Sequence, residues 1–98
     1  MSKLTDAQIA DRMTALPQWT LAGDKIRREF TCPSFADAVA FIVRVGFDAE
    51  AADHHPDILI NYKRVTLTYS THSEGGLTEK DFDGAAGASA LASAMGGN

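Results

Sequence analysis

The chain has 98 residues, of which 45% are hydrophobic and 22% are charged, and its formal net charge is −4. These values are typical of a small globular protein, and we expect a single domain that covers residues 1–98. The nine Lys and Arg residues are scattered along the sequence, which argues against the clustered basic patch that nucleic-acid binding needs.

The cysteine content and the apolar segments indicate the compartment. Cys32 has no second cysteine with which to form a disulfide within the chain, so we expect an inert, partly buried thiol in a reducing environment. Asp, Gln and Arg interrupt the N-terminal residues, which therefore lack the apolar stretch of a signal peptide. No window approaches the roughly 18 apolar residues of a membrane span. We therefore expect a cytoplasmic protein that does not bind membranes.

A helix is predicted near residues 5–15. Thr5 and Gln8 have the spacing of a capping box, in which two side chains satisfy the first free N–H groups of a helix. Apolar residues then recur at helical spacing until Pro17, which ends the pattern.

A β-hairpin follows this helix. Residues 19–22 and 25–31 look extended, and Gly23-Asp24 between them has the composition of a tight turn. Ile26 and Phe30 mark the buried face of the second strand, because side chains alternate between the two faces of a strand.

A second helix is predicted from Ser34, with Asp37 completing a capping arrangement, to about Asp53. Pro56 supports this end, because proline disfavours a helical residue before it. The apolar stripe of this helix comprises Phe35, Ala38, Phe41, Ile42, Val45, Ala49 and Ala52.

Two further strands, at 58–61 and 64–71, and a last helix complete the chain. Gly75-Gly76 ends the second of these strands, and Thr78 caps an alanine-rich helix that fades into the glycine-bearing tail. The order α-β-β-α-β-β-α predicts an α+β fold with one four-stranded antiparallel sheet and the helices packed on one face.

All three histidines lie where predicted elements end. His54 and His55 follow the second helix, and His72 follows the fourth strand, on the same side as its polar residues. Asp81 falls in the first turn of the last helix, and Glu50 lies one helical turn before His54. An imidazole has an ordinary pKa of about 6.5 and exchanges protons near neutral pH, while a neighbouring carboxylate fixes its tautomer. The pattern is typical of an acid/base site.

Each of these residues also has a purely structural interpretation. Adjacent histidines at a helix end can bind its last carbonyl groups and interact with the helix dipole. Asp81 can be the acidic partner of Thr78 in an N-terminal cap. Glu50 and His54 can form a surface pair one helical turn apart. Periodicity alone leaves both interpretations open.

The spacing of these residues resembles the signature of the pterin-4a-carbinolamine dehydratase family. The matching positions are Glu50, His54-His55-Pro56, Tyr62, His72 and Asp81. The segment from His54 to Phe82, HHPDILINYKRVTLTYSTHSEGGLTEKDF, is similar to the family almost throughout, and the resemblance covers residues 4–90. The last helix departs most, because GAAGASALASAMGGN lacks the charged residues that we would expect there.

The resemblance implies a hydro-lyase that converts 4a-hydroxytetrahydropterin into quinonoid dihydropterin and so supports tetrahydrobiopterin recycling. It implies no metal and no other cofactor. The implied catalytic residues are His54, His55, His72 and Asp81, with His55 as the principal acid/base group, and the implied substrate-binding residues are Glu50, Pro56 and Trp19. Trp19 suits a second role equally well, as an aromatic residue that anchors the first hairpin to the core.

Two other functions compete with this prediction. Three histidines can bind zinc, but their spacing matches no common zinc motif, and adjacent side chains of an extended backbone point apart. The family is also known for a dimerisation cofactor of a transcription factor in animals, so a non-catalytic binding module on the same fold is the alternative. The resemblance further implies a homodimer or a dimer of dimers, with an aromatic amino-acid hydroxylase as a protein partner.

Overall fold

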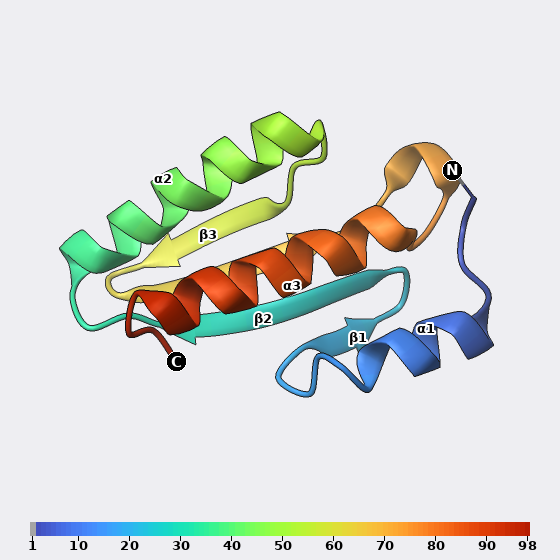
Figure 1. Ribbon diagram of the computed structural model, residues 1–98, viewed down its shortest axis with the longest axis horizontal. Helices are drawn as coiled ribbons and strands as arrows, with labels where there is room; N and C mark the ends of the chain where they lie inside the picture. The colour runs from blue at the N-terminus through green and yellow to red at the C-terminus, as the bar shows by residue number, and fades with distance from the viewer. Residues whose placement is uncertain (1) are drawn as a thin grey trace.

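The computed structural model describes residues 2–98 and confirms the predicted order of helices and strands (Figure 1). In chain order the elements are α1 (Asp6–Met13), β1 (Thr20–Ala22), β2 (Lys25–Thr31), α2 (Phe35–Ala52), β3 (Asp57–Asn61), β4 (Arg64–Tyr69), the short 3-10 helix η1 (His72–Glu74) and α3 (Glu79–Ala94).

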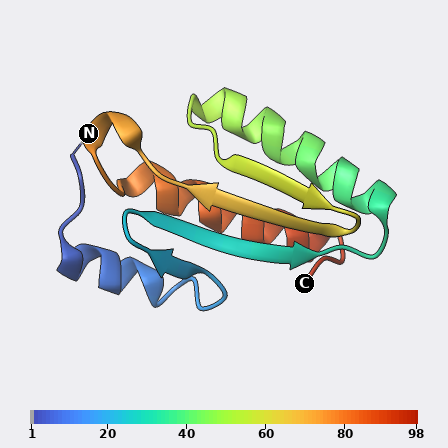
Figure 2. The same ribbon diagram turned by 180° about the vertical axis from the view of Figure 1, so that it is seen from behind.

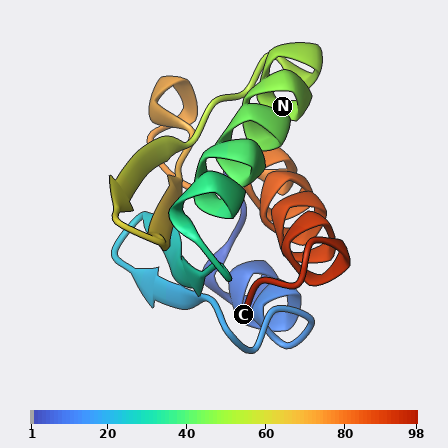
Figure 3. The same cartoon turned by 90° about the vertical axis from the view of Figure 1, so that its left-hand side faces the viewer.

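The four strands form one antiparallel sheet in the order β1-β2-β4-β3. The two hairpins therefore lie side by side, with β2 and β4 in the centre and β1 and β3 at the edges. A side view shows the helices on one side of this sheet (Figure 3), and the view from behind shows its other face uncovered (Figure 2). The predicted α+β fold is confirmed.

Capping residues begin the helices where the sequence predicts. Thr5 and Gln8 form a capping box at α1, and the Ser34 hydroxyl accepts a hydrogen bond from the Asp37 backbone N–H at α2. Asp53 ends α2 in the left-handed conformation, with φ of 51°. This residue reverses the chain direction, and it thereby determines where the two following histidines point.

The fourth strand is shorter than predicted, because it ends at Tyr69 instead of residue 71. Thr71 forms an isolated bridge with Gly76, and the three residues from His72 to Glu74 form η1 between them. His72 therefore lies on a helical turn beyond the sheet.

The core lies between the sheet and the helices, and it contains the predicted Ile26 and Phe30 of β2 together with Phe41 of α2. Phe35, which belongs to the predicted apolar stripe of α2, is exposed, as is Phe47 further along this helix. Cys32 is buried, and burial, followed by the charge of Asp37, raises the pKa of its thiol, as an unreactive cysteine requires.

Within residues 2–98, no helix has both the length and the apolar character needed to cross a membrane.

Candidate active site

The junction between α2 and β3 directs two adjacent histidines in different directions. After the left-handed Asp53, the backbone N–H of His54 donates to the carbonyl of Ala49, which holds the chain against the end of α2. His54 is largely buried, whereas the His55 side chain is 53% exposed. Each imidazole has its own carboxylate partner.

His54 pairs with Asp81, from the first turn of α3. Nε2 of His54 lies 2.6 Å from Oδ1 of Asp81, and the Asp81 side chain is fully buried. The ring of His54 also stacks against Tyr69, with 6.2 Å between the ring centroids and 24° between the ring planes. The imidazole is thus positioned by a carboxylate and by an aromatic ring.

The second carboxylate oxygen of Asp81 caps α3. Oδ2 accepts from the Thr71 hydroxyl at 2.8 Å and from the Thr78 backbone N–H at 2.9 Å. The hydroxyls of Thr71 and Thr78 lie 3.0 Å apart, so they also share a hydrogen bond. One carboxylate oxygen of Asp81 therefore forms the predicted cap of α3, and the other contacts His54. This network satisfies a carboxylate that would be costly to bury without partners.

His55 pairs with Glu50, near the surface. Nε2 of His55 lies 2.5 Å from Oε1 of Glu50, and both side chains are exposed. The sequence left open a surface pair of Glu50 with His54, but the turn at Asp53 brings His55 to Glu50 instead.

These contacts determine which ring nitrogen can exchange protons with a ligand. An ionised carboxylate only accepts hydrogen bonds, so Nε2 of both His54 and His55 carries the hydrogen in these pairs. The other nitrogen, Nδ1, then accepts a proton in the neutral ring and donates one in the protonated ring. The arrangement can therefore perform acid/base chemistry at an accessible imidazole beside a buried one.

Comparison with known proteins agrees with this geometry. The family model described as pterin 4 alpha carbinolamine dehydratase matches residues 2–91. The chain belongs to this family.

Several bacterial relatives of the pterin-4a-carbinolamine dehydratase family, all provisionally named as that enzyme, are similar over most of the chain. A protein of Roseiflexus sp. (strain RS-1) is 54% identical over 82 residues, which are 84% of this chain and 88% of the relative. A protein of Roseiflexus castenholzii is 57% identical over 83 residues, or 85% and 89%.

Solved structures agree as well. The crystal structure of a transcriptional coactivator/pterin dehydratase from Brucella melitensis has a TM-score of 0.89 at 34% identity, over 93% of this chain and 99% of that one. A pterin dehydratase-like protein, identified as a RuBisCO assembly factor in the alpha-carboxysome, shares the fold, with a TM-score of 0.64 at 24% identity over 76% and 86% of the two chains.

The other residues implied by the family resemblance lie at different depths. Pro56 is half-buried directly after the histidines, and His72 is exposed on η1, without a hydrogen bond from its ring to residues 2–98. Trp19 is buried against Phe30 and Tyr69, and its indole N–H donates to Ser89. That placement favours the core role of Trp19, while its contact with substrate stays a prediction. Across residues 2–98, no group of three or more His, Cys, Asp or Glu side chains could hold a metal ion.

Three residues that contact His54 or Asp81 were not predicted to lie at the candidate site. Thr71 and Thr78 bind Asp81, and Tyr69 packs against His54. A signal existed for Thr78, which was expected only as a helix cap. Thr71 immediately precedes His72, but nothing in the pattern indicated that its hydroxyl meets α3.

Proposed function

We propose that this protein catalyses the dehydration of 4a-hydroxytetrahydropterin to quinonoid dihydropterin. The observation that carries the proposal is the pair of adjacent histidines, His54 and His55, each held through Nε2 by a separate carboxylate. Membership of the family supports the substrate class. The buried, reduced Cys32 is consistent with the cytoplasm, where we place the reaction in tetrahydrobiopterin recycling.

The reaction needs one acid and one base. The acid protonates the hydroxyl at C4a, the C4a–O bond breaks, and water leaves. The base removes the proton from N5, and the electron pair of that N–H bond forms the C4a=N5 double bond. One proton enters and one leaves, so the balance requires no oxidant or reductant. A positioned acid or base typically contributes about 10²–10⁴-fold to the rate.

His55 suits the principal proton transfer because it is the more accessible of the paired imidazoles. With Nε2 held by Glu50, its Nδ1 is free to exchange a proton with a ligand outside the helix end. Glu50 acts as a positioning residue, since it fixes both the tautomer and the orientation of the ring.

His54 and Asp81 form the inner part of the proposed site. The buried pair holds the end of α2 against the start of α3, and His54 is placed for the complementary proton transfer or for binding the pterin. We assign His72 a binding role, because η1 presents it at the surface after β4, and Pro56 the role of fixing the backbone after the histidines.

The test follows the dehydration of freshly generated 4a-hydroxytetrahydropterin by ultraviolet absorbance. We expect acceleration by the wild type, the same rate after EDTA treatment, and a loss of at least about 10²-fold in His55→Ala. Circular dichroism should show that His55→Ala remains folded, since the His55 side chain is exposed. Folded wild-type protein that gives no acceleration would refute the enzyme function. Loss of the rate on EDTA treatment would instead support a metal site.

A binding module is the second candidate, and exposed apolar side chains favour it. Ile58, Leu59 and Ile60 lie on β3, an edge strand whose outer side is unpaired among residues 2–98, and Phe47 is 69% exposed on α2. Exposed apolar edge strands readily pair with another strand. We propose that a second copy of the chain covers β3, giving a homodimer or a dimer of dimers, and that an aromatic amino-acid hydroxylase is a further partner.

A further inference from the structure

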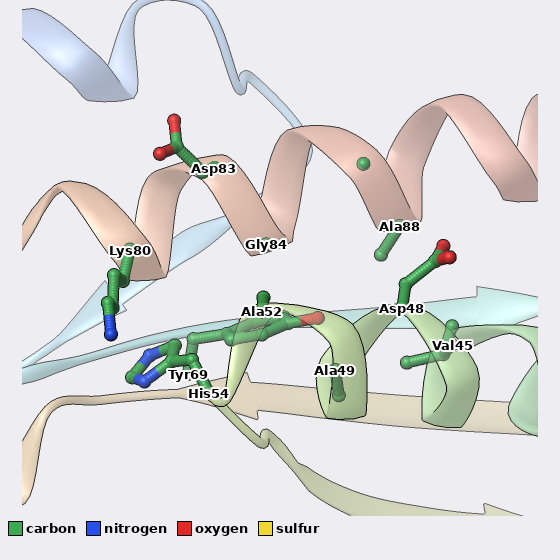
Figure 4. Close-up of a pocket in the computed structure, with 11 residues that line it drawn as sticks. Val45, Asp48, Ala49, Ala52, His54, Tyr69, Lys80, Asp83, Gly84 and Ala88 are labelled. Atoms are coloured by element: carbon green, nitrogen blue, oxygen red, sulfur yellow. The ribbon is translucent and has the colours of Figure 1, made fainter.

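A pocket that adjoins the proposed active site lies between α2 and α3, beside β4. It has a volume of about 510 Å³, and its walls are mostly small or apolar side chains, including Val45, Ala49 and Ala88 (Figure 4). His54 lines one end of it, but Glu50, His55 and His72 do not line it. The pocket therefore adjoins the proposed active site at His54 and does not include His55.

Two glycines of α3, Gly84 and Gly87, line the pocket. At Gly84 the helix approaches the sheet so closely that an added Cβ would lie 2.5 Å from Cε1 of Tyr69. At Gly87, one turn later, an added Cβ would meet nothing within 4 Å, so the space beside this residue is open. The same helix is thus in tight contact at one glycine and leaves a gap at the next.

A polar group points into this space. The side chain of Tyr69 is 3% exposed, and its hydroxyl forms no hydrogen bond with residues 2–98. Figure 4 shows the ring beside His54, with its oxygen directed away from the imidazole, toward the part of the pocket lined by Asp48 and Val45. No buried side-chain nitrogen or oxygen of residues 2–98 lacks a hydrogen-bond partner, so the unpaired Tyr69 oxygen is open to the pocket and available to a ligand.

The hydroxyl is a donor at neutral pH. Burial first, and then the charges of Asp48 and Asp81, raise the pKa of Tyr69 to about 12, so the phenol keeps its proton. A ligand that complements the pocket is therefore apolar over most of its surface and has one acceptor atom for Tyr69. The volume is in the range of about 300–1,000 Å³ that small-molecule sites occupy.

We propose that this pocket binds a small aromatic or alicyclic molecule that carries a single carbonyl-type acceptor, hydrogen-bonded to the hydroxyl of Tyr69. The ligand would lie between the glycine face of α3 and the Ala49 side of α2, in contact with His54. The proposal concerns binding alone and does not depend on the dehydratase activity.

Acetophenone and α-methylstyrene are matched probes, because the second replaces the carbonyl of the first by a CH₂ group of similar shape. Amide chemical shifts of the isotopically labelled full chain would be followed by NMR during titration with each probe. We expect saturable shifts in α2 and α3 around the pocket, with acetophenone binding about 3- to 10-fold more tightly, as one hydrogen bond allows. Tyr69→Phe, which keeps the ring, should remove that difference.

A second pair of variants tests whether the probes bind in this pocket. Gly87→Leu fills the open space and should abolish binding of both probes, while Gly46→Leu makes the same change in α2, away from the pocket, and should leave binding unchanged. Both variants gain helix propensity, so neither is expected to unfold the chain. The proposal is wrong if neither probe gives saturable shifts, if the two bind equally well, or if Gly87→Leu binds them like the wild type.

Discussion

Nε2 of His54 and Oδ1 of Asp81 lie 2.6 Å apart, although 27 residues separate them in the chain. The contact joins the end of α2 to the first turn of α3, and the other oxygen of the same carboxylate caps α3 through Thr78. Because one buried side chain performs both tasks, the position of the imidazole is fixed relative to the start of the helix. The site and the fold are therefore stabilised by the same residue.

Asp81→Asn should destabilise the protein by about 1–3 kcal/mol, which is the usual consequence of leaving buried hydrogen-bonding groups unpaired. The amide NH₂ would face a donor at either His54 or Thr78, both of which require an acceptor. Urea unfolding measures the loss. Asp83→Asn, the same change two residues further on at an exposed site, should stay within about 0.5 kcal/mol of the wild type. Equal stability of the two variants would contradict the assignment.

Glu50→Gln should lower the dehydration rate with little effect on stability. Both members of the Glu50–His55 pair are exposed, so the pair contributes little to folding. Without the carboxylate, His55 loses its fixed tautomer and orientation, and we expect a fall in kcat of at least about 10-fold. The pH–rate profile should change as well, which a purely structural role would not cause. Glu29→Gln, exposed on β2, is the control, and equal kcat values would refute the positioning role.

The local patterns in the sequence predicted most of the fold. The capping box at Thr5, the alternation around Ile26 and Phe30, and the cap at Thr78 each depend on residues a few positions apart, and the structure confirms all three. Such signals are carried by hydrogen bonds and side-chain directions within one element. Their strength does not depend on the rest of the molecule.

Features that depend on contacts between distant elements were harder to predict. The pairing of Glu50 with His55 follows from the left-handed conformation of Asp53. The neighbouring residues gave no sequence signal for this conformation. Phe35 lies on the apolar stripe of α2 but is exposed, because burial depends on how the helix packs and not on its own pattern. The pocket beside Gly87 arises only once α3 packs over Tyr69, so the glycine-rich composition of this helix could not reveal it.

Replacing each of two helical glycines by alanine should change the stability of the protein in opposite directions. Gly84→Ala would place a Cβ 2.5 Å from the ring of Tyr69, and since that ring is buried, we expect destabilisation by about 1–3 kcal/mol. Gly46→Ala meets nothing within 4 Å and should stabilise α2 by about 0.5–1 kcal/mol. Thermal unfolding of both variants checks the pair. A melting temperature that rises in both would show that α3 does not approach β4 so closely.

Leu59→Lys tests whether a second copy covers β3. Leu59 is 65% exposed on this edge strand, and a charge there would oppose pairing with another strand. Light scattering coupled to size exclusion should show a wild-type oligomer and a smaller species for Leu59→Lys. Leu21→Lys makes the same change on β1, at the opposite edge of the sheet, and should leave the mass unchanged. A monomeric wild type would contradict the proposed interface at β3.

The protein should become less stable at alkaline pH, because the buried Tyr69 then loses its proton. Burial, with smaller contributions from the charges of Asp48 and Asp81, raises its pKa to about 12, compared with about 10 for an exposed tyrosine. The stabilisation that Tyr69 provides is complete below about pH 10 and is lost as the pH rises to about 12, because the unfolded chain releases this proton first. A shift of about two units corresponds to about 2–3 kcal/mol in the free energy of unfolding.

Urea unfolding at a series of pH values tests this dependence. The free energy of unfolding should fall more steeply above about pH 10 in the wild type than in Tyr69→Phe, which has no proton to lose at this position. Tyr62→Phe removes a phenol from an exposed site and should keep the wild-type slope. If Tyr69→Phe instead keeps the full slope, Tyr69 is not the group whose raised pKa causes the loss of stability, and this prediction would be wrong.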